Sequence, residues 1–240
     1  MNKKLIAIII AVIVIITIVL MALLGQQENN HNEMIDEKPI SESVVIKDKA
    51  SMINTSKRAV DVIIPEFQNL EDGYESYINN KIYSDLSDVN VYDELTHGLS
   101  DEEIGKFTYE ASYERYNCGE YVSVVANQYI YLEGAARPKT QKKCYVVNAK
   151  ENASATIVDV FDDKLNYKKA ILDEINLQAK LNDIELIGGN GLTNIADTQQ
   201  FYIKDNKLVI YFEASEIAAT AVGELEFVMP FEFVNNKFVI

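Results

Sequence analysis

Histidine, the side chain that most often carries acid–base or zinc chemistry near neutral pH, is scarce in this sequence. Its 240 residues contain two histidines, His31 in a polar N-terminal stretch and His97 in an acidic stretch that lacks cysteine or carboxylate at metal-ligand spacing. A zinc site or a histidine-dependent hydrolase needs several such groups at defined spacing. The G-x-S-x-G pattern around a hydrolase serine does not occur either. We therefore expect no catalytic residue, no metal ion and no cofactor.

Carboxylates are the one reactive group present in excess, with 37 Asp and Glu against 22 Lys and Arg and a formal net charge of −15. Glu213 and Glu216 flank an expected loop, and a glycosidase needs only two acids at a suitable separation. Among so many acidic residues such a pair arises by chance, so it is weak support for a carbohydrate-active enzyme. The acidic balance opposes binding to nucleic acid and anionic lipid, and it suits either a cationic partner or simple solubility.

The two cysteines are expected to be far apart. Cys118 lies in an expected hairpin turn at one end of a long strand, and Cys144 follows the turn at the other end of that strand. About twelve strand residues at about 3.3 Å each would separate them, which exceeds the reach of a disulfide. We expect two free thiols, even in a compartment that permits disulfides.

An uncharged apolar run, LIAIIIAVIVIITIVLMALL, occupies residues 5–24. A helix of this length, at about 1.5 Å per residue, spans the roughly 30 Å of a bilayer core. The run is longer than the apolar part of a signal peptide, and no convincing cleavage pattern follows it. We expect a single-pass anchor in the cell membrane, with secretion after signal cleavage as the alternative. Lys3 and Lys4 then place residues 1–4 in the cytoplasm and the bulk of the chain outside.

The remainder is expected to divide into a stalk and one folded region. Residues 25–42 are polar and aperiodic, which is typical of a flexible stalk. Residues 43–150 are expected to form the N-terminal part of an extracytoplasmic α+β region. Residues 151–240 are expected to form its C-terminal part and to pack with the first as one unit.

The fold class expected from the pattern of elements is α+β, with an antiparallel β-sheet backed by about two helices and preceded by the transmembrane helix. Apolar–polar alternation predicts strands at residues 44–47, at 59–64 up to Pro65, in a meander over 107–149, and in a hairpin around Asp205-Asn206 at 201–212. Apolar spacing predicts a helix over residues 70–86, followed by an acidic connection at 87–103. Residues 157–181 are expected to begin as a short strand and to continue as a helix capped by Asp162 or Asp163, with its inward face formed by Leu165, Leu172, Ile175 and Ala179.

Three segments resemble a known family. YLEGAARPKT at residues 131–140 resembles a Y-x-E-G-G-A-H-P-x-T-like motif in the extracytoplasmic region of anti-sigma-V factors of the RsiV type. The same region forms the non-catalytic N-terminal part of some membrane-anchored peptidoglycan deacetylases. TIVDVFDD at 156–163 and LVIYFEASEIAATAVGELEFVMPFEF at 208–233 resemble later segments of that family, in the same order. The chain departs from the family at Ala135 and Arg137, where glycine and histidine are usual, and at Ala219 and Thr220.

The resemblance implies a binding or sensing role, which includes lysozyme binding in some members. Only four residues precede the apolar run, so we expect no sigma-factor-binding segment. The sequence ends at Ile240 with the accessory region, so we also expect no catalytic deacetylase segment. The first hypothesis is a membrane-anchored extracytoplasmic binding or sensor module of the cell envelope, whose partner is a cationic protein such as lysozyme or a cell-wall component. The alternatives are a structural or accessory envelope protein that acts through another membrane protein, and a carboxylate-based enzyme. Candidate partner-binding residues are those of the two motif loops, Glu133, Arg137, Glu213 and Glu216, although charged loop residues are often merely solvated.

Overall fold

The computed structural model of the chain describes residues 40–100, 102–161 and 166–229. All of them belong to one compact unit, Pro39–Ile240. The expected cytoplasmic stub at 1–4, the expected anchor at 5–24 and nearly all of the expected stalk at 25–42 lie outside the described residues. Among the helices that are described, none has the length and apolar character needed to cross a membrane.

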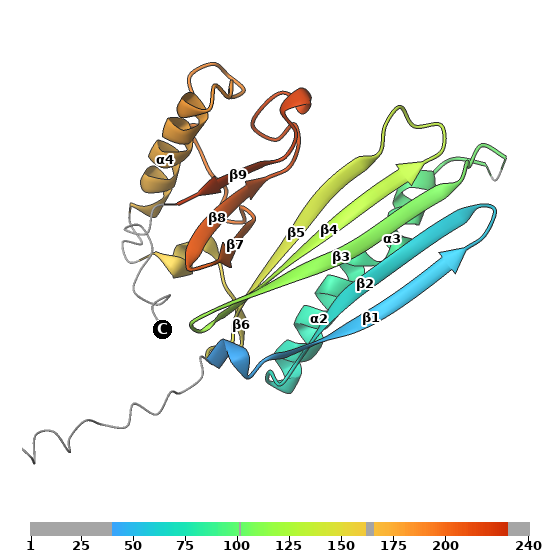
Figure 1. Cartoon of the computed structure of the whole chain (residues 1–240), viewed down its shortest axis with the longest axis horizontal. Coiled ribbons are helices and arrows are strands. Elements are labelled where there is room, and N and C mark those ends of the chain that lie inside the picture. Colours follow the sequence, from blue (N-terminus) through green and yellow to red (C-terminus); the bar gives the residue numbers. More distant parts are fainter. Residues whose placement is uncertain (1–39, 101, 162–165, 230–240) are drawn as a thin grey trace, which may run out of the picture. The chain divides into compact units, whose positions relative to one another are not determined.

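A six-stranded sheet forms the larger layer (Figure 1). Its strands follow the chain order, β1 (Val45–Asn54), β2 (Arg58–Gln68), β3 (Phe107–Cys118), β4 (Tyr121–Leu132), β5 (Lys139–Asn148) and β6 (Ala153–Ser154). The expected meander is confirmed in β3, β4 and β5, which are antiparallel neighbours. The expectation of a purely antiparallel sheet is wrong, because β2 and β3 are parallel. A parallel pair needs a crossover, and helices α2 (Asp72–Leu86) and α3 (Asp88–Thr96) supply it.

The second strand does not end at Pro65. It continues to Gln68, and Pro65 pairs with Asp48 of β1. Only residues Arg58 to Val62 of β2 pair with β3. At Pro65 the strand therefore has no neighbour on its other side, which is where a sheet tolerates the missing N–H of proline.

Helices α2 and α3 cover one face of this sheet (Figure 1). Ile78, Ile82 and Leu86 of α2 are buried against the sheet, whereas Tyr77 of the same helix is 58% exposed. Helix α3 occupies part of the acidic stretch expected to be a plain connection. It packs through Tyr92, whose ring stands edge-on to Phe107 at 5.2 Å between centroids.

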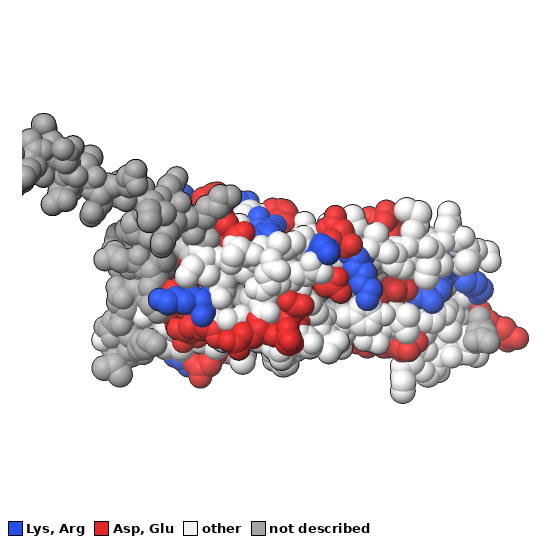
Figure 2. Space-filling model, turned by 90° about the horizontal axis from the view of Figure 1, so that it is seen from below, with Lys and Arg blue, Asp and Glu red and all other residues white. Residues whose placement is uncertain are grey.

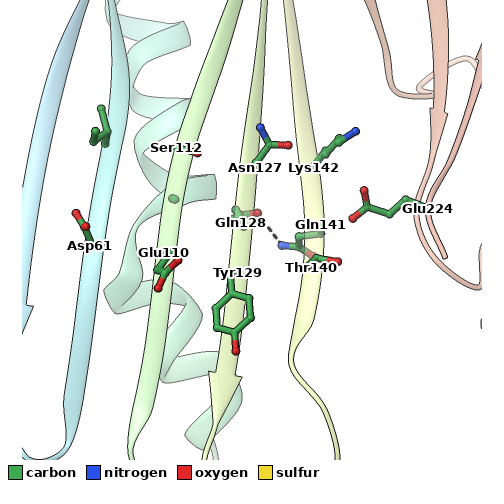
Figure 3. Close-up of a pocket in the computed structure, with 12 residues that line it drawn as sticks. Asp61, Glu110, Ser112, Asn127, Gln128, Tyr129, Thr140, Gln141, Lys142 and Glu224 are labelled. Atoms are coloured by element: carbon green, nitrogen blue, oxygen red, sulfur yellow. Dashed lines mark hydrogen bonds between the residues drawn. The ribbon is translucent and has the colours of Figure 1, made fainter.

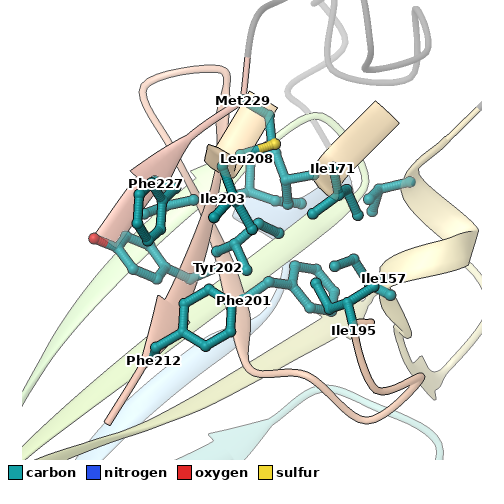
Figure 4. Packing of buried hydrophobic residues seen from close by; sticks show 14 of the residues in the cluster. Ile157, Ile171, Ile195, Phe201, Tyr202, Ile203, Leu208, Phe212, Phe227 and Met229 are labelled. Carbon is teal, nitrogen blue, oxygen red and sulfur yellow. The ribbon is translucent and has the colours of Figure 1, made fainter. Parts of the chain in front are cut away.

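A three-stranded antiparallel sheet and a helix form the C-terminal part. The strands are β7 (Phe201–Lys204), β8 (Lys207–Phe212) and β9 (Leu225–Val228), and the helix is α4 (Tyr167–Leu181). Figure 4 shows Ile171 of α4 packed among Phe201, Ile203 and Leu208. The predicted hairpin is confirmed: Asp205 and Asn206 have φ values of 50° and 57°, as a two-residue primed turn requires.

The segment before α4 differs from the prediction. Ile157–Val160 is a 3₁₀ helix and not a strand, because Thr156 and Asp159 form a reciprocal capping box at its start. The predicted caps Asp162 and Asp163, together with Leu165, lie outside the described residues. Helix α4 starts after Asn166, and its buried face consists of Tyr167, Ile171, Ile175 and Ala179.

The smaller sheet rests on the face of the larger sheet that the helices leave uncovered. The backbone N–H of Ile203 in β7 donates to the buried Ser123 hydroxyl of β4 at 2.9 Å. The backbone N–H of Lys142 in β5 donates to the Tyr211 hydroxyl at 3.1 Å. The smaller sheet thus covers one end of this face, near Tyr121 and Val125. Farther along the same face, Glu110 and Ser112 stay exposed.

Candidate functional site

Both loops that carry the family resemblance line one cleft. The turn at 133–138 joins β4 to β5, and the segment at 213–224 joins β8 to β9. A cavity of about 380 Å³ lies between Arg137, Lys139 and Thr140 on the first side and Glu213, Ser215 and Thr220 on the second. The fold therefore brings together two segments that are more than seventy positions apart in the sequence.

The turn has one position that requires glycine. Gly134 has a φ of 101°, and open space surrounds the place where a side chain would begin. Glycine is therefore required here by the positive φ of the backbone, and not by a lack of space for a side chain. Ala135 stands where the similar family has a second glycine. Its φ is not positive, and its N–H donates to the Leu132 carbonyl at 2.9 Å. Alanine fits this position without strain.

Glu133 does not face the cleft. Its carboxylate Oε2 accepts the backbone N–H of Lys106 at 2.9 Å, and its own N–H donates to the Lys106 carbonyl at 2.9 Å. Gly105 lies so close that an added Cβ would stand 2.5 Å from the Glu133 carbonyl oxygen. Glu133 thus fastens the turn to the segment before β3, which is a structural role.

The two glutamates of the second loop have different surroundings. Glu216 closes its own loop, because its Oε2 accepts the N–H of Glu213 at 2.7 Å and its Oε1 accepts the Gln199 side-chain amide at 3.2 Å. Glu213 forms an ion pair with Lys143 at 3.5 Å, and each of these two side chains is 33% exposed. Glu213 is therefore the one with a carboxylate directed to the cleft and open to a partner.

Arg137 stands between the cleft and a smaller niche. This niche, of about 150 Å³, is lined by apolar residues of α3 and β4, which include Val91, Leu95 and Ile130. Arg137 is exposed and forms no hydrogen bond or ion pair with any residue that the structure describes. Its guanidinium, which stays charged at all physiological pH values, is available to a carboxylate or carbonyl oxygen.

A second cavity, of about 400 Å³, lies on the open part of the larger sheet (Figure 3). Asp61, Glu110, Asn127 and Tyr129 form part of its floor, and Glu224 reaches toward it from the segment before β9. Sequence reasoning missed this cavity. Polar residues do alternate with apolar ones along β2, β3 and β4. Which of these polar residues become neighbours depends on the pairing register of the strands, and a sequence pattern within one strand does not show that register.

The cysteines do not form a chemical centre. Both are thiols, and Cys118 is buried and donates to Asn206 Oδ1 at 2.9 Å. Burial raises the pKa of Cys118 to about 11, so this side chain is a neutral thiol near pH 7. Within residues 40–100, 102–161 and 166–229, no cluster of three or more His, Cys, Asp or Glu side chains could hold a metal ion. His97 follows the last residue of α3.

A search of curated proteins finds no match to this chain. Among solved structures, it is similar to a DUF3298 family protein from Pseudomonas aeruginosa PAO1, with a TM-score of 0.58 and 8% identity over 83% of this chain and 98% of that chain. A DUF3298 family member from Bacteroides fragilis NCTC 9343 aligns with a TM-score of 0.49 and 15% identity over 80% of this chain and 92% of that chain. At 8% identity the Pseudomonas structure supports the fold alone.

The comparison with protein families concerns the C-terminal part. Residues 158–232 match the family model "Protein of unknown function (DUF3298)". The matched residues include α4, the three-stranded sheet and the loop that carries Glu213, and they stop short of the turn that carries Arg137. The chain therefore carries a DUF3298 domain in its C-terminal part.

Proposed function

We propose that this chain is a membrane-anchored binding or sensor module of the cell envelope, related to the extracytoplasmic region of RsiV-type anti-sigma factors. Its partner is a cationic protein such as lysozyme, and the cleft between residues 133–140 and 213–223 is the contact surface. One observation carries the proposal: the two segments that resemble the family most clearly line the same cavity. A loop pair placed on rigid sheets is a common form of recognition site.

The charges of the chain support a cationic partner. The formal net charge of −15 favours the approach of a positively charged protein through long-range attraction. Figure 2 shows patches of acidic side chains, with basic ones among them, on one face of the molecule. In the cleft, the one ion pair of the Glu213 carboxylate among the described residues is with the partly exposed Lys143, so a basic side chain of the partner can compete for it. Arg137 offers a complementary contact for an acidic or carbonyl oxygen.

A second candidate function rests on the exposed surface of α3. Val89 and Leu95 are 47% and 41% exposed, and Leu95 also lines the apolar niche beside Arg137. Exposed apolar side chains next to a niche favour docking on another protein. This feature supports the alternative of an accessory protein that acts through another membrane protein.

The test measures binding of hen lysozyme to the full-length chain in nanodiscs by calorimetry. We expect saturable binding that weakens at least about fivefold between about 50 and about 300 mM salt, because screening shortens the range of charge attraction. Glu213→Gln and Arg137→Ala should each weaken binding at least about fivefold at low salt.

Glu102→Gln is the matched control, because Glu102 is exposed and lies outside the cleft. Its affinity should equal that of the unaltered chain. Lysozyme binding that is absent at both salt concentrations would refute the cationic-protein proposal. Binding that both cleft variants leave unchanged would refute the assigned surface.

A further inference from the structure

We propose that the open face of the six-stranded sheet is a second binding site, and that its ligand is a short oligosaccharide. The site is the cavity of about 400 Å³ on the side of β2 to β5 that faces away from α2 and α3 (Figure 3). This volume falls within the roughly 300–1,000 Å³ typical of small-ligand sites. The inference does not depend on the cleft between the two motif loops.

The register of the strands assembles the floor of the cavity. Asp61 of β2 lies opposite Glu110 of β3. Ser112 of β3 lies opposite Asn127 of β4, and Tyr129 of β4 lies opposite Thr140 of β5. Neighbouring strands are about 4.8 Å apart. Hydroxyl, amide and carboxylate groups therefore form a closely spaced array on one surface.

The polar side chains on the open face of the floor have no hydrogen-bond partners among the residues that the structure describes. On the helix-covered face, Gln128 donates to the Tyr109 hydroxyl at 2.6 Å, and Gln141 donates to Gln128 at 2.8 Å. On the open face, the side chains of Asp61, Glu110, Ser112, Asn127 and Thr140 form no hydrogen bond with any residue in the described part of the chain. Their hydrogen-bonding capacity is therefore available to a ligand.

Glu224 adds a wall with an unsatisfied acceptor. It reaches from the segment before β9 toward Thr140 and Lys142 (Figure 3). Its Oε1 atom is buried and has no hydrogen-bond partner among the described residues. A buried acceptor without a partner is unfavourable because it has lost its hydrogen bonds to water, and a donor on a bound ligand would restore one. Lys142 is already paired with Glu226 and does not fill the role.

The side chains that line the cavity favour a ligand that is uncharged, carries many hydrogen-bond donors and has some apolar surface. Asp61, Glu110 and Glu224 repel phosphates and other anions, and they accept strong hydrogen bonds from hydroxyl groups. The Tyr129 ring and the Ile63 side chain provide apolar surface for the C–H face of a sugar ring. Oligosaccharides combine these properties.

The floor is unsuited to a peptide. Recognition of an extended peptide by a sheet uses the free backbone groups of an edge strand. Strands β3 and β4 lie inside the sheet with neighbours on both sides, so their backbone groups are engaged in the ladder. The side chains are thus the groups that a ligand here can contact.

The test uses the full-length chain in nanodiscs and four neutral trisaccharides, namely chitotriose, cellotriose, maltotriose and mannotriose. Saturation-transfer NMR and calorimetry should show saturable binding of at least one of them. Tyr129→Ala and Glu110→Gln should each weaken that binding at least about tenfold, through loss of the stacking surface and of a charged acceptor.

Two substitutions of the same types serve as controls. Tyr77→Ala removes an exposed tyrosine of α2, and Glu102→Gln removes an exposed carboxylate outside the cavity. Both should keep the affinity of the unaltered chain, and circular dichroism should show that every variant is folded. Saturable binding of none of the four sugars would overturn the proposal, as would binding that Tyr129→Ala and Glu110→Gln leave intact. Neither result bears on the lysozyme cleft, whose variants are Arg137→Ala and Glu213→Gln.

Discussion

At the scale of single residues, hydrogen bonds and ion pairs distinguish the charged side chains that hold the loops in place from those that can contact a partner. Glu133 and Glu216 both accept backbone N–H groups of their own or a neighbouring loop. Arg137 has no such bond within the described residues, and Glu213 has a single ion pair that is partly exposed to solvent. Glu133 and Glu216 therefore fix loop conformations, whereas Arg137 and Glu213 can contact a partner.

The Cys118 thiol gives a prediction at this scale. Burial raises its pKa from 9.0 to about 11, so at pH 8 about a hundredfold less thiolate is present than in the unfolded chain. In the variant Cys144→Ser, iodoacetamide should alkylate Cys118 at least about a hundredfold more slowly in buffer than in concentrated urea. Mass spectrometry of timed samples measures both rates. Equal rates in buffer and in urea would show that the thiol is not buried.

The same shift predicts how stability depends on pH. The folded-state pKa of Cys118 lies above its value in the unfolded chain, so the stabilising contribution is complete below about pH 9 and is lost as the pH rises to about 11. Urea unfolding midpoints measured from pH 8 to pH 11 should fall for the unaltered chain. The fall should be smaller for Cys118→Ala, which has no thiol to titrate, and an identical fall would contradict the assignment.

At the scale of elements, a fully buried hydrogen bond is one of the contacts that connect the two sheets. Strand β7 is an edge strand of the smaller sheet, and its Ile203 N–H donates to Ser123 in the larger sheet. Ser123 is fully buried, so no water can replace its hydroxyl. This bond holds the DUF3298 domain against β4 and thereby sets the position of the loop that carries Glu213.

Ser123→Ala should therefore lower the free energy of unfolding by about 1–3 kcal/mol, because it leaves the buried Ile203 N–H without an acceptor. Differential scanning calorimetry should show a fall in Tm of about 2–4 °C per kcal/mol. Ser112→Ala is the control, since Ser112 is an exposed strand residue. Its effect should stay within about 0.5 kcal/mol. Equal effects of the two substitutions would show that the bond between the sheets does not contribute.

Sequence patterns predict the helices and strands whose formation depends on residues that are close together in the sequence. The alternation in β3, β4 and β5 and the Asp205-Asn206 hairpin depend on residues close in sequence, and both predictions are confirmed. Helix α3 was missed because its formation depends on Tyr92 packing on Phe107 and on the ion pair between Asp88 and Arg58. The parallel pairing of β2 and β3 was missed because it follows from the crossover helices and not from the strand pattern.

At the scale of the whole described region, the candidate sites depend on how the two sheets meet. The sequence singled out Arg137 and Glu213 separately, on loops that are distant in the chain. Their common cleft arises because β5 and β8 are brought together, with the Tyr211 hydroxyl accepting the Lys142 N–H. The cavity on the open face is likewise lined by Glu224, in the segment that leads into β9, and by Asp61 of the larger sheet. No local pattern encodes such pairs.

Hydrogen–deuterium exchange of the full-length chain, with and without hen lysozyme, tests the central claim most directly. We expect slower exchange on binding in peptides that cover residues 133–140 and 213–223, because both loops line the proposed contact surface. Peptides from β1, on the far edge of the larger sheet, should exchange at unchanged rates. Protection confined to other segments, or no protection at saturating lysozyme, would contradict the account.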